Sequence, residues 1–239
     1  MIPPRIGIIG GMGPEATLLL QWKLFAATDA ADDGGHIPLL VDMNPQVPSR
    51  IAFLIEDRGE NPGPILAEMA RRLETQGARA LAMPCNTAHC FAPEIEQAVT
   101  IPLLHMPALA AAKAAERSSG AKLVGILASP ATARTGLFSD VLAAQSLRPL
   151  YPKDQSAMLD AIRHIKADRS KAVATRTVQQ AADELTEHGV GSLIIGCSEF
   201  STIAGEIRAS VPIIDALNAL VDRIIDFANA PRKPTARPA

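Results

Sequence analysis

The chain has 239 residues, of which 48% are apolar and 20% are charged, a balance typical of a globular protein with a sizeable core. The net charge of −2 and the aromatic content of 3% give no basis for a nucleic-acid-binding surface or for attraction to an anionic membrane. No apolar run approaches the roughly 20 residues that a membrane-spanning helix needs.

We expect a cytoplasmic protein. The chain has three cysteines, an odd number that cannot form a closed set of disulfides, and this favours a reducing compartment. The opening segment, 1–11, runs into a glycine-rich loop too early for a secretory signal. The segment 229–239 is rich in proline and basic residues and is expected to fray.

Short apolar runs alternate with longer amphipathic stretches along the chain. Most of the runs are continuously apolar, which is typical of parallel strands covered on both faces. The stretches 65–77 and 178–189 have helical spacing, and each ends at a glycine suited to a helix C-cap. This alternation predicts α/β layers with parallel sheets. The predicted strands are 5–10, 37–43, 80–84, 101–105, 122–127, 147–151, 192–196 and 211–215.

Three landmarks recur in the second half of the chain in the same order and at nearly constant separation. Such a recurrence favours duplication of a unit about half the chain long. The pairs are Gly7 with Gly125, Cys85 with Cys197 and Ile101 with Val211, at separations of 118, 112 and 110 residues. We therefore expect two related lobes that face each other across a cleft.

Cys85 and Cys197 each follow a predicted strand and precede a predicted helix. Ligands of parallel sheets bind beyond the carboxyl ends of the strands. Backbone N–H groups at a helix start lower a thiol pKa from its ordinary value of about 8.5. Either cysteine alone would more often be a small buried hydrophobe, but the parallel placement favours a pair facing one cleft. Such a pair is suited to removing a proton from one face of a stereocentre and returning one to the other face.

Four motifs, GIIGGMGP at 7–14, NPQVPSR at 44–50, MPCNTAH at 83–89 and GCSEF at 196–200, resemble the aspartate/glutamate racemase family, most closely its cofactor-independent aspartate racemase branch. The resemblance extends to about residue 228. It implies two pseudo-symmetric lobes, each with a mainly parallel four-stranded sheet flanked by helices, and a site between them. By this resemblance 1–106 plus 216–239 form the N-lobe and 107–215 form the C-lobe.

The resemblance also implies an enzyme, a racemase that interconverts L- and D-aspartate or a related acidic amino acid. It would need neither pyridoxal phosphate nor another cofactor, and no metal, and it would act as a homodimer. Cys85 and Cys197 would be the paired acid and base. The substrate-binding residues would be Met12, Arg50, Asn86, Thr87, Thr132, Lys166 and Ser198.

The implied roles of these residues differ. Asn86, Thr87 and Ser198 would hold the α-carboxylate, although the first two could equally cap a helix. Arg50 and Lys166 would hold the side-chain carboxylate, for which the arginine fork is well shaped. Two departures from the family pattern are Ser198, where threonine is usual, and Ser49, where an aspartate is common before the arginine.

Other functions stay open at this point. Gly11, Gly13 and Ala16 fit the G-x-G-x-x-A pattern of NAD-dependent oxidoreductases, but Pro14 removes one N–H donor from the turn that would hold phosphate. A non-catalytic amino-acid-binding protein or a racemase of broad specificity would share the same fold.

A metal site is a further alternative. Cys85 and His89 are four residues apart, and Cys90 and Cys197 could complete a ligand set. The paired cysteine spacing of structural zinc sites is missing, however. His89 could instead be a base or a residue that packs the helix after Cys85. Cys90 has no counterpart in the other half and is expected to be structural.

Overall fold

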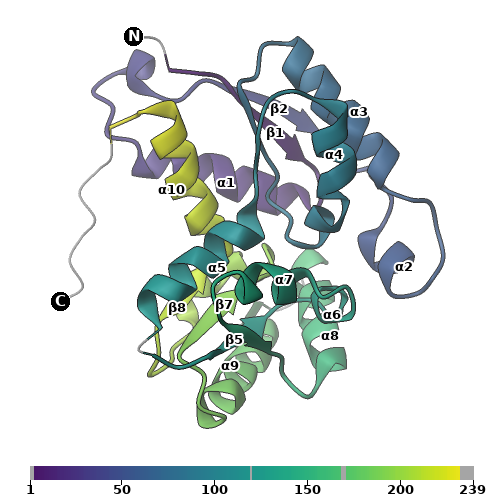
Figure 1. Ribbon diagram of the computed structural model, residues 1–239, viewed down its shortest axis with the longest axis vertical. Helices are drawn as coiled ribbons and strands as arrows, with labels where there is room; N and C mark the ends of the chain where they lie inside the picture. The colour runs from purple at the N-terminus through teal and green to yellow at the C-terminus, as the bar shows by residue number, and fades with distance from the viewer. Residues whose placement is uncertain (1–2, 119, 168–170, 232–239) are drawn as a thin grey trace.

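The computed structural model describes residues 3–118, 120–167 and 171–231, which form two lobes (Figure 1). Residues 232–239, most of the tail that is expected to fray, lie outside the described residues. None of the helices in the described ranges is both long enough and apolar enough to cross a membrane.

Two four-stranded sheets form the centres of the lobes, and all their strand pairings are parallel. The strand orders are β2-β1-β3-β4 and β6-β5-β7-β8, so the second sheet repeats the topology of the first. The predicted fold class is confirmed, and each predicted run contains one strand. The strands are β1 (Ile6–Gly10), β2 (Leu39–Met43), β3 (Ala80–Ala82), β4 (Leu103–Leu104), β5 (Leu123–Leu127), β6 (Arg148–Leu150), β7 (Ser192–Ile195) and β8 (Ile213–Asp215).

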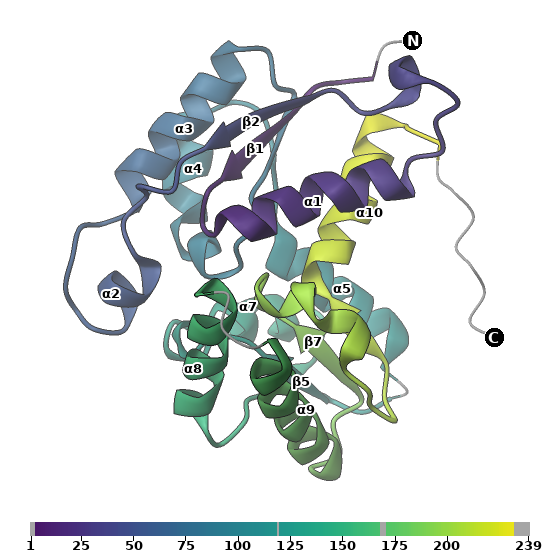
Figure 2. The ribbon, with the colours of Figure 1, turned by 180° about the vertical axis from the view of Figure 1, so that it is seen from behind.

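Helices cover both faces of each sheet (Figures 1 and 2). In the first half of the chain they are α1 (Pro14–Ala27), α2 (Arg50–Leu54), α3 (Gly63–Thr75), α4 (Ala92–Ala98) and α5 (Met106–Arg117). In the second half they are α6 (Pro130–Arg134), α7 (Leu137–Ala143), α8 (Gln155–Lys166), α9 (Lys171–Glu187) and α10 (Ala216–Ala228). Short 3₁₀ turns are η1 (Asp33–Gly35), η2 (Thr87–Phe91), η3 (Phe200–Thr202) and η4 (Ala204–Glu206).

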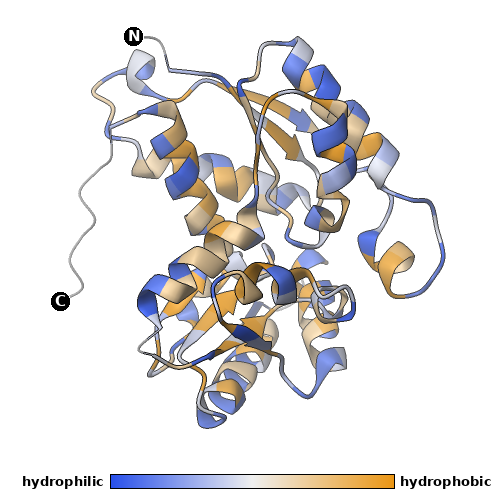
Figure 3. Ribbon diagram, in the orientation of Figure 1, coloured by the Kyte–Doolittle hydropathy of each residue, from blue (hydrophilic) through white to orange (hydrophobic). Residues whose placement is uncertain are grey.

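Alternation along the strands divides the buried side chains between two sides of each sheet. In β1, Ile6 and Ile8 join the central core, whereas Ile9 packs with α3 and α4 on the other face. In β5, Ile126 joins the central core and Leu127 packs with α8 and α9. Because successive side chains of a strand point to opposite faces, a continuously apolar strand is buried on both sides. Figure 3 shows this pattern as apolar strands inside polar-faced helices.

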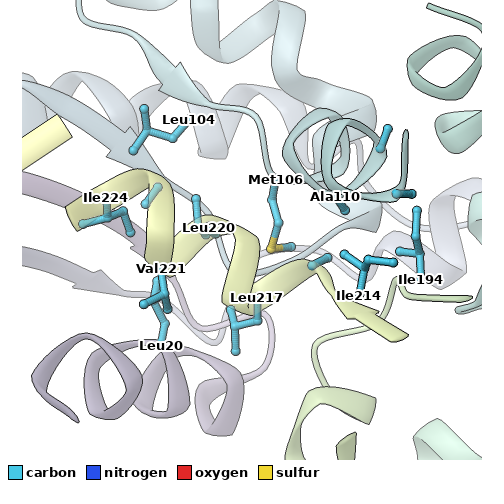
Figure 4. Packing of buried hydrophobic residues seen from close by; sticks show 14 of the residues in the cluster. Leu20, Leu104, Met106, Ala110, Ile194, Ile214, Leu217, Leu220, Val221 and Ile224 are labelled. Carbon is cyan, nitrogen blue, oxygen red and sulfur yellow. The ribbon is translucent and has the colours of Figure 1, made fainter. Parts of the chain in front are cut away.

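Helix α10 has the most extensive buried face, and it belongs to the central core. Asp215 caps its N-terminus by accepting the Leu217 N–H, and Asn229 ends it in the left-handed conformation. Its residues Leu217, Leu220 and Ile224 pack among side chains from both sheets and from α1 and α5 (Figure 4). The assignment of 216–239 to the N-lobe, like the predicted homodimer and cytoplasmic location, stays a prediction.

The loop after β1 depends on glycine at one position. Gly11 has a φ of +95°, and an added Cβ would lie 2.3 Å from the backbone carbon of Asn44, after β2. Its N–H donates to the Thr17 hydroxyl of α1 at 3.0 Å. The loop is therefore held against both neighbouring elements.

Gly11→Ala should lower the free energy of unfolding by more than about 2 kcal/mol, because it combines left-handed strain with a backbone clash. Gly189→Ala is the matched control, since Gly189 has a φ of +76° but nothing within 4 Å of the added Cβ. That variant should lose about 1 kcal/mol from strain alone. Urea unfolding measures both, and equal losses would contradict the role of the Asn44 contact.

Candidate active site

A small cavity of about 60 Å³ lies where the two lobes face each other, and both Cys85 and Cys197 line it. Cys85 follows β3 and Cys197 follows β7, so the thiols come from equivalent loops of the two sheets. They are 9% and 7% exposed. The full lining is Met12, Ser49, Arg50, Ile51, Cys85, Thr87, Ser129, Ile162, Lys166, Cys197 and Glu199.

A second, larger cavity of about 520 Å³ adjoins the first. The glycine loop at 11–13 and the start of α1 line it on the side of the first lobe. The two cavities share four lining residues, Ser49, Arg50, Lys166 and Glu199. These side chains therefore form the wall between an inner chamber that holds the thiols and an outer one.

A still larger cavity, about 660 Å³, lies elsewhere, between α1, α5 and α10. It contains no cysteine, although charged side chains such as Lys113 and Asp222 line it. We place the candidate site in the smaller inner cavity, since that is where nucleophilic and charged groups from both lobes converge.

The surroundings of Cys85 are fixed by a buried histidine. The Met106 N–H donates to His89 Nε2 at 3.2 Å, so this nitrogen carries no proton. The other ring nitrogen, Nδ1, therefore donates to the Cys85 carbonyl oxygen, 2.9 Å away. Burial, helped by the neighbouring His105, lowers the pKa of His89 to about 3. His89 is a neutral residue that holds the Cys85 loop, and it does not line the cavity.

Cys197 has a charged partner instead. Its Sγ donates to Glu199 Oε2 at 3.0 Å, and Glu199 Oε1 lies 3.0 Å from Lys166 Nζ. Burial and then the Glu199 carboxylate raise the pKa of the Cys197 thiol well above its ordinary value. Burial alone would lower the pKa of Lys166, but the Glu199 carboxylate outweighs it and the pKa is raised. The thiol form of Cys197 and the charged form of Lys166 are thus both favoured.

Six of the nine residues predicted from the sequence line the inner cavity: Met12, Arg50, Cys85, Thr87, Lys166 and Cys197. The Thr87 hydroxyl lies 3.2 Å from the Ser129 hydroxyl across the cavity, and this contact joins the two lobes.

The other three predicted residues are buried beside the cavity without lining it. The side-chain amide of Asn86 and the hydroxyl of Ser198 have no hydrogen-bond partner among the described residues. Buried polar groups are normally paired, so these two unpaired groups beside the cavity stand out as candidates for contact with a bound molecule. The Thr132 hydroxyl, in contrast, donates to the Ser129 carbonyl at 2.8 Å and belongs to the start of α6.

Arg50 is held by backbone carbonyls. Its Nη1 donates to Val47 at 3.2 Å and Pro48 at 2.8 Å, and its Nη2 donates to Met12 at 3.4 Å. A guanidinium has five N–H donors, so these three bonds position it and leave donors for a carboxylate. Ser49, where the family pattern has aspartate, caps α2 by accepting the Ala52 N–H at 3.2 Å.

Sequence reasoning missed Glu199 and Ser129. Glu199 lies two residues after Cys197, inside the GCSEF motif. Ser129 lies two residues after the end of β5, just as Met12 lies two residues after the end of β1. The rule that parallel strands present their chemistry at their carboxyl ends would have included both.

The alternative metal site is not formed. No group of three or more His, Cys, Asp or Glu side chains in the described ranges is placed to hold a metal ion. Cys90, one of the proposed ligands, instead donates to the Thr135 hydroxyl at 3.4 Å.

Comparison with known proteins shows the family to which the chain belongs. The profile of the Asp/Glu/Hydantoin racemase family matches residues 9–224. The chain belongs to that family. It is therefore an isomerase of the racemase class.

Individual relatives of this racemase differ in their substrates. The solved aspartate racemase of Picrophilus torridus is 30% identical, covers 96% of each chain and has a TM-score of 0.84. The broad-specificity amino-acid racemase RacX of Bacillus subtilis is 27% identical over 88% of this chain and 92% of its own length. A glutamate racemase isoform, RacE1 of Bacillus anthracis, shares the fold with a TM-score of 0.65 at 18% identity, covering 95% of this chain and 81% of its own.

The low pKa of His89 predicts a dependence of stability on pH. Between its ordinary value of 6.5 and about 3, the unfolded chain takes up a proton that the folded protein does not. Stability should therefore fall as the pH falls through this range, and His89 should contribute up to about 1.4 kcal/mol per pH unit. His89→Gln should reduce that slope in urea unfolding between pH 4 and 6.5, and an unchanged slope would contradict a buried neutral histidine.

Proposed function

We propose that this enzyme interconverts the enantiomers of an acidic amino acid, with aspartate as the best candidate, through Cys85 and Cys197. The observation that carries the proposal is that two thiols, from equivalent loops of opposite lobes, line one cavity. A group on each side of the substrate is what inversion by two bases requires.

The proposed reaction balances without a further reactant. The thiolate of one cysteine takes the proton from Cα, which breaks the C–H bond and leaves the electron pair delocalised into the carboxylate. The thiol of the other cysteine then gives its proton to the opposite face of Cα. The two sulfurs end with exchanged protonation states, and exchange with water resets them.

The developing negative charge on the α-carboxylate needs donors that are already in place. Thr87 lies in the cavity wall, and the unpartnered groups of Asn86 and Ser198 lie directly beside the two cysteines in sequence. We assign these three residues to the α-carboxylate. The side-chain amide of Asn86 and the hydroxyl of Ser198 lack partners among the described residues, so these two groups give up no existing hydrogen bond when they bind it.

The position of the two cations supports a dicarboxylic substrate. The inner cavity, at about 60 Å³, is much smaller than common ligand sites of about 300–1,000 Å³, so a substrate extends into the outer cavity. Arg50 and Lys166 line both cavities. A substrate with Cα between the thiols would thus present its side chain to two positive charges.

A second candidate is a racemase that accepts many amino acids, which the similarity to the broad-specificity RacX favours. The two candidates differ in how much catalysis depends on Arg50 and Lys166. A broad-specificity enzyme would turn over neutral amino acids well without using either cation.

Replacing Cys85 or Cys197 by alanine should reduce racemisation of aspartate by at least about 10³-fold, because each removes the group that serves one face. Cys90→Ala is the matched control, since Cys90 lies five residues after Cys85 but outside the cavity lining. It should keep its activity. Racemisation is followed by chiral chromatography, and near-parental activity of either of the first two variants would overturn the proposal.

Arg50→Lys and Lys166→Gln should each lower kcat/KM for aspartate by about 10- to 100-fold, the range expected for loss of a charged hydrogen bond. The effect on alanine, which has no distal carboxylate, should be much smaller. Lys171→Gln is the control, because Lys171 pairs with Glu15 at 2.8 Å outside the inner cavity. High turnover of alanine by the parent enzyme, with small losses on both substrates in Arg50→Lys and Lys166→Gln, would favour the broad-specificity alternative. Equally large losses on both substrates would contradict the assignment of these two cations to the distal carboxylate.

A further inference from the structure

Glu199 divides its carboxylate between two partners with different functions. Oε2 accepts the Cys197 thiol proton at 3.0 Å, and Oε1 pairs with Lys166 at 3.0 Å. The Glu199 side chain is only 13% exposed, whereas that of Lys166 is 45% exposed. The ammonium is therefore the accessible end of a short chain of contacts that leads to a buried sulfur.

The charges around Cys197 act in opposite directions. The Glu199 carboxylate, on the same loop, opposes a thiolate, and the Lys166 ammonium at the end of α8 favours one. Arg50 and the second thiol, Cys85, face it across the cavity from the first lobe. Because Glu199 is in direct contact with the sulfur, its influence exceeds that of the more distant ammonium.

The two cysteines differ in this respect. The Cys85 loop is held by a histidine that is neutral and turned away from the cavity, whereas the Cys197 loop carries an anion in contact with its sulfur. The two lobes repeat the same fold, but only the second has a charged group in contact with its cysteine. An enzyme with such a site starts each cycle with a preferred distribution of the proton between the two cysteines.

We propose that Glu199 is a positioning residue that keeps Cys197 as the thiol in the resting enzyme and couples its protonation to the occupancy of Lys166. This deepens the proposed function and rests on it. A ligand carboxylate that binds Lys166 neutralises the cation that favours the thiolate, and so it strengthens the hold of Cys197 on its proton. A dicarboxylate thus meets Cys197 as proton donor and Cys85 as base.

An amino acid without a distal carboxylate leaves the Lys166–Glu199 pair intact. Cys197 then keeps the weaker proton affinity of the free enzyme. Glu199 would in this way help to discriminate acidic from neutral substrates, although it need not touch either one.

The test measures the ionisation midpoint of Cys197, which is the pH at which half of this residue is thiolate. Two methods measure it: iodoacetamide labelling with peptide mass spectrometry, and ultraviolet thiolate absorbance relative to Cys197→Ser. In Glu199→Gln, which removes the charge and keeps an acceptor, the midpoint should fall by about 1 pH unit or more. In Lys166→Met it should rise. Glu15→Gln, whose carboxylate lines only the outer cavity, should leave it unchanged.

Opposite shifts of the Cys197 midpoint in Glu199→Gln and Lys166→Met distinguish an electrostatic role from a structural one. General loosening of the loop would move the midpoint in the same direction in both variants. A midpoint in Glu199→Gln within about 0.3 pH unit of the parent would overturn the proposal. So would shifts of one sign in both variants.

Succinate, a dicarboxylate without an amino group, tests the coupling to Lys166. In the parent enzyme it should raise the midpoint of Cys197, and calorimetry should show that it binds. Binding without a shift, or no binding at all, would overturn the coupling. Racemisation is assayed separately. If the Cys197 midpoints are as expected but the enzyme has no activity on acidic amino acids, the proposed function is overturned and the role of Glu199 stands.

Discussion

The packing of α10 and α5 against both sheets is the constraint on which the rest of the structure depends. Side chains of these helices share one continuous apolar core with Ile6 and Ile8 of the first sheet and with Ile126 and Ile194 of the second. Burial of apolar surface stabilises the folded state by about 25 cal/mol per Å², so separating the lobes would be costly. The carboxyl edges of the two sheets therefore face each other at a fixed separation.

Ionic contacts also join segments of the two halves of the chain. Arg134 of α6 pairs with Asp57 at 2.8 Å, and Lys171 of α9 pairs with Glu15 at 2.8 Å. These side chains are well exposed, and such pairs contribute little stability each. The apolar core, rather than these ionic contacts, therefore determines the relative position of the lobes.

Much of the fold follows from local sequence. Short apolar runs marked the strands of both described sheets, and most of these runs are continuously apolar because a parallel strand covered by helices is buried on both faces. The duplication was visible at Gly7 and Gly125, and packing explains both: an added Cβ would lie within 3.0 Å of Leu81 in one half and 2.5 Å of Leu193 in the other. In each sheet a leucine of the neighbouring strand leaves no room for a side chain.

The site was less predictable, because it depends on contacts between distant segments. An acidic residue near the start of a turn is common for reasons of local electrostatics, so Glu199 had no distinguishing signal until the fold placed Lys166, 33 positions earlier, against it. The choice between Ser129 and Thr132 depends on which side of the start of α6 faces the cavity. Composition and spacing do not specify that orientation.

The central claim, that two thiols act on opposite faces of one carbon, is tested most directly by racemisation of L-aspartate in D₂O. During the first turnovers the D-aspartate formed should carry deuterium at Cα while the remaining L-aspartate keeps protium, because the proton donor exchanges with solvent and the base does not return its proton to the same face. Substrate-derived protium in the early product, or deuterium appearing equally in both enantiomers, would indicate a single base and contradict the account.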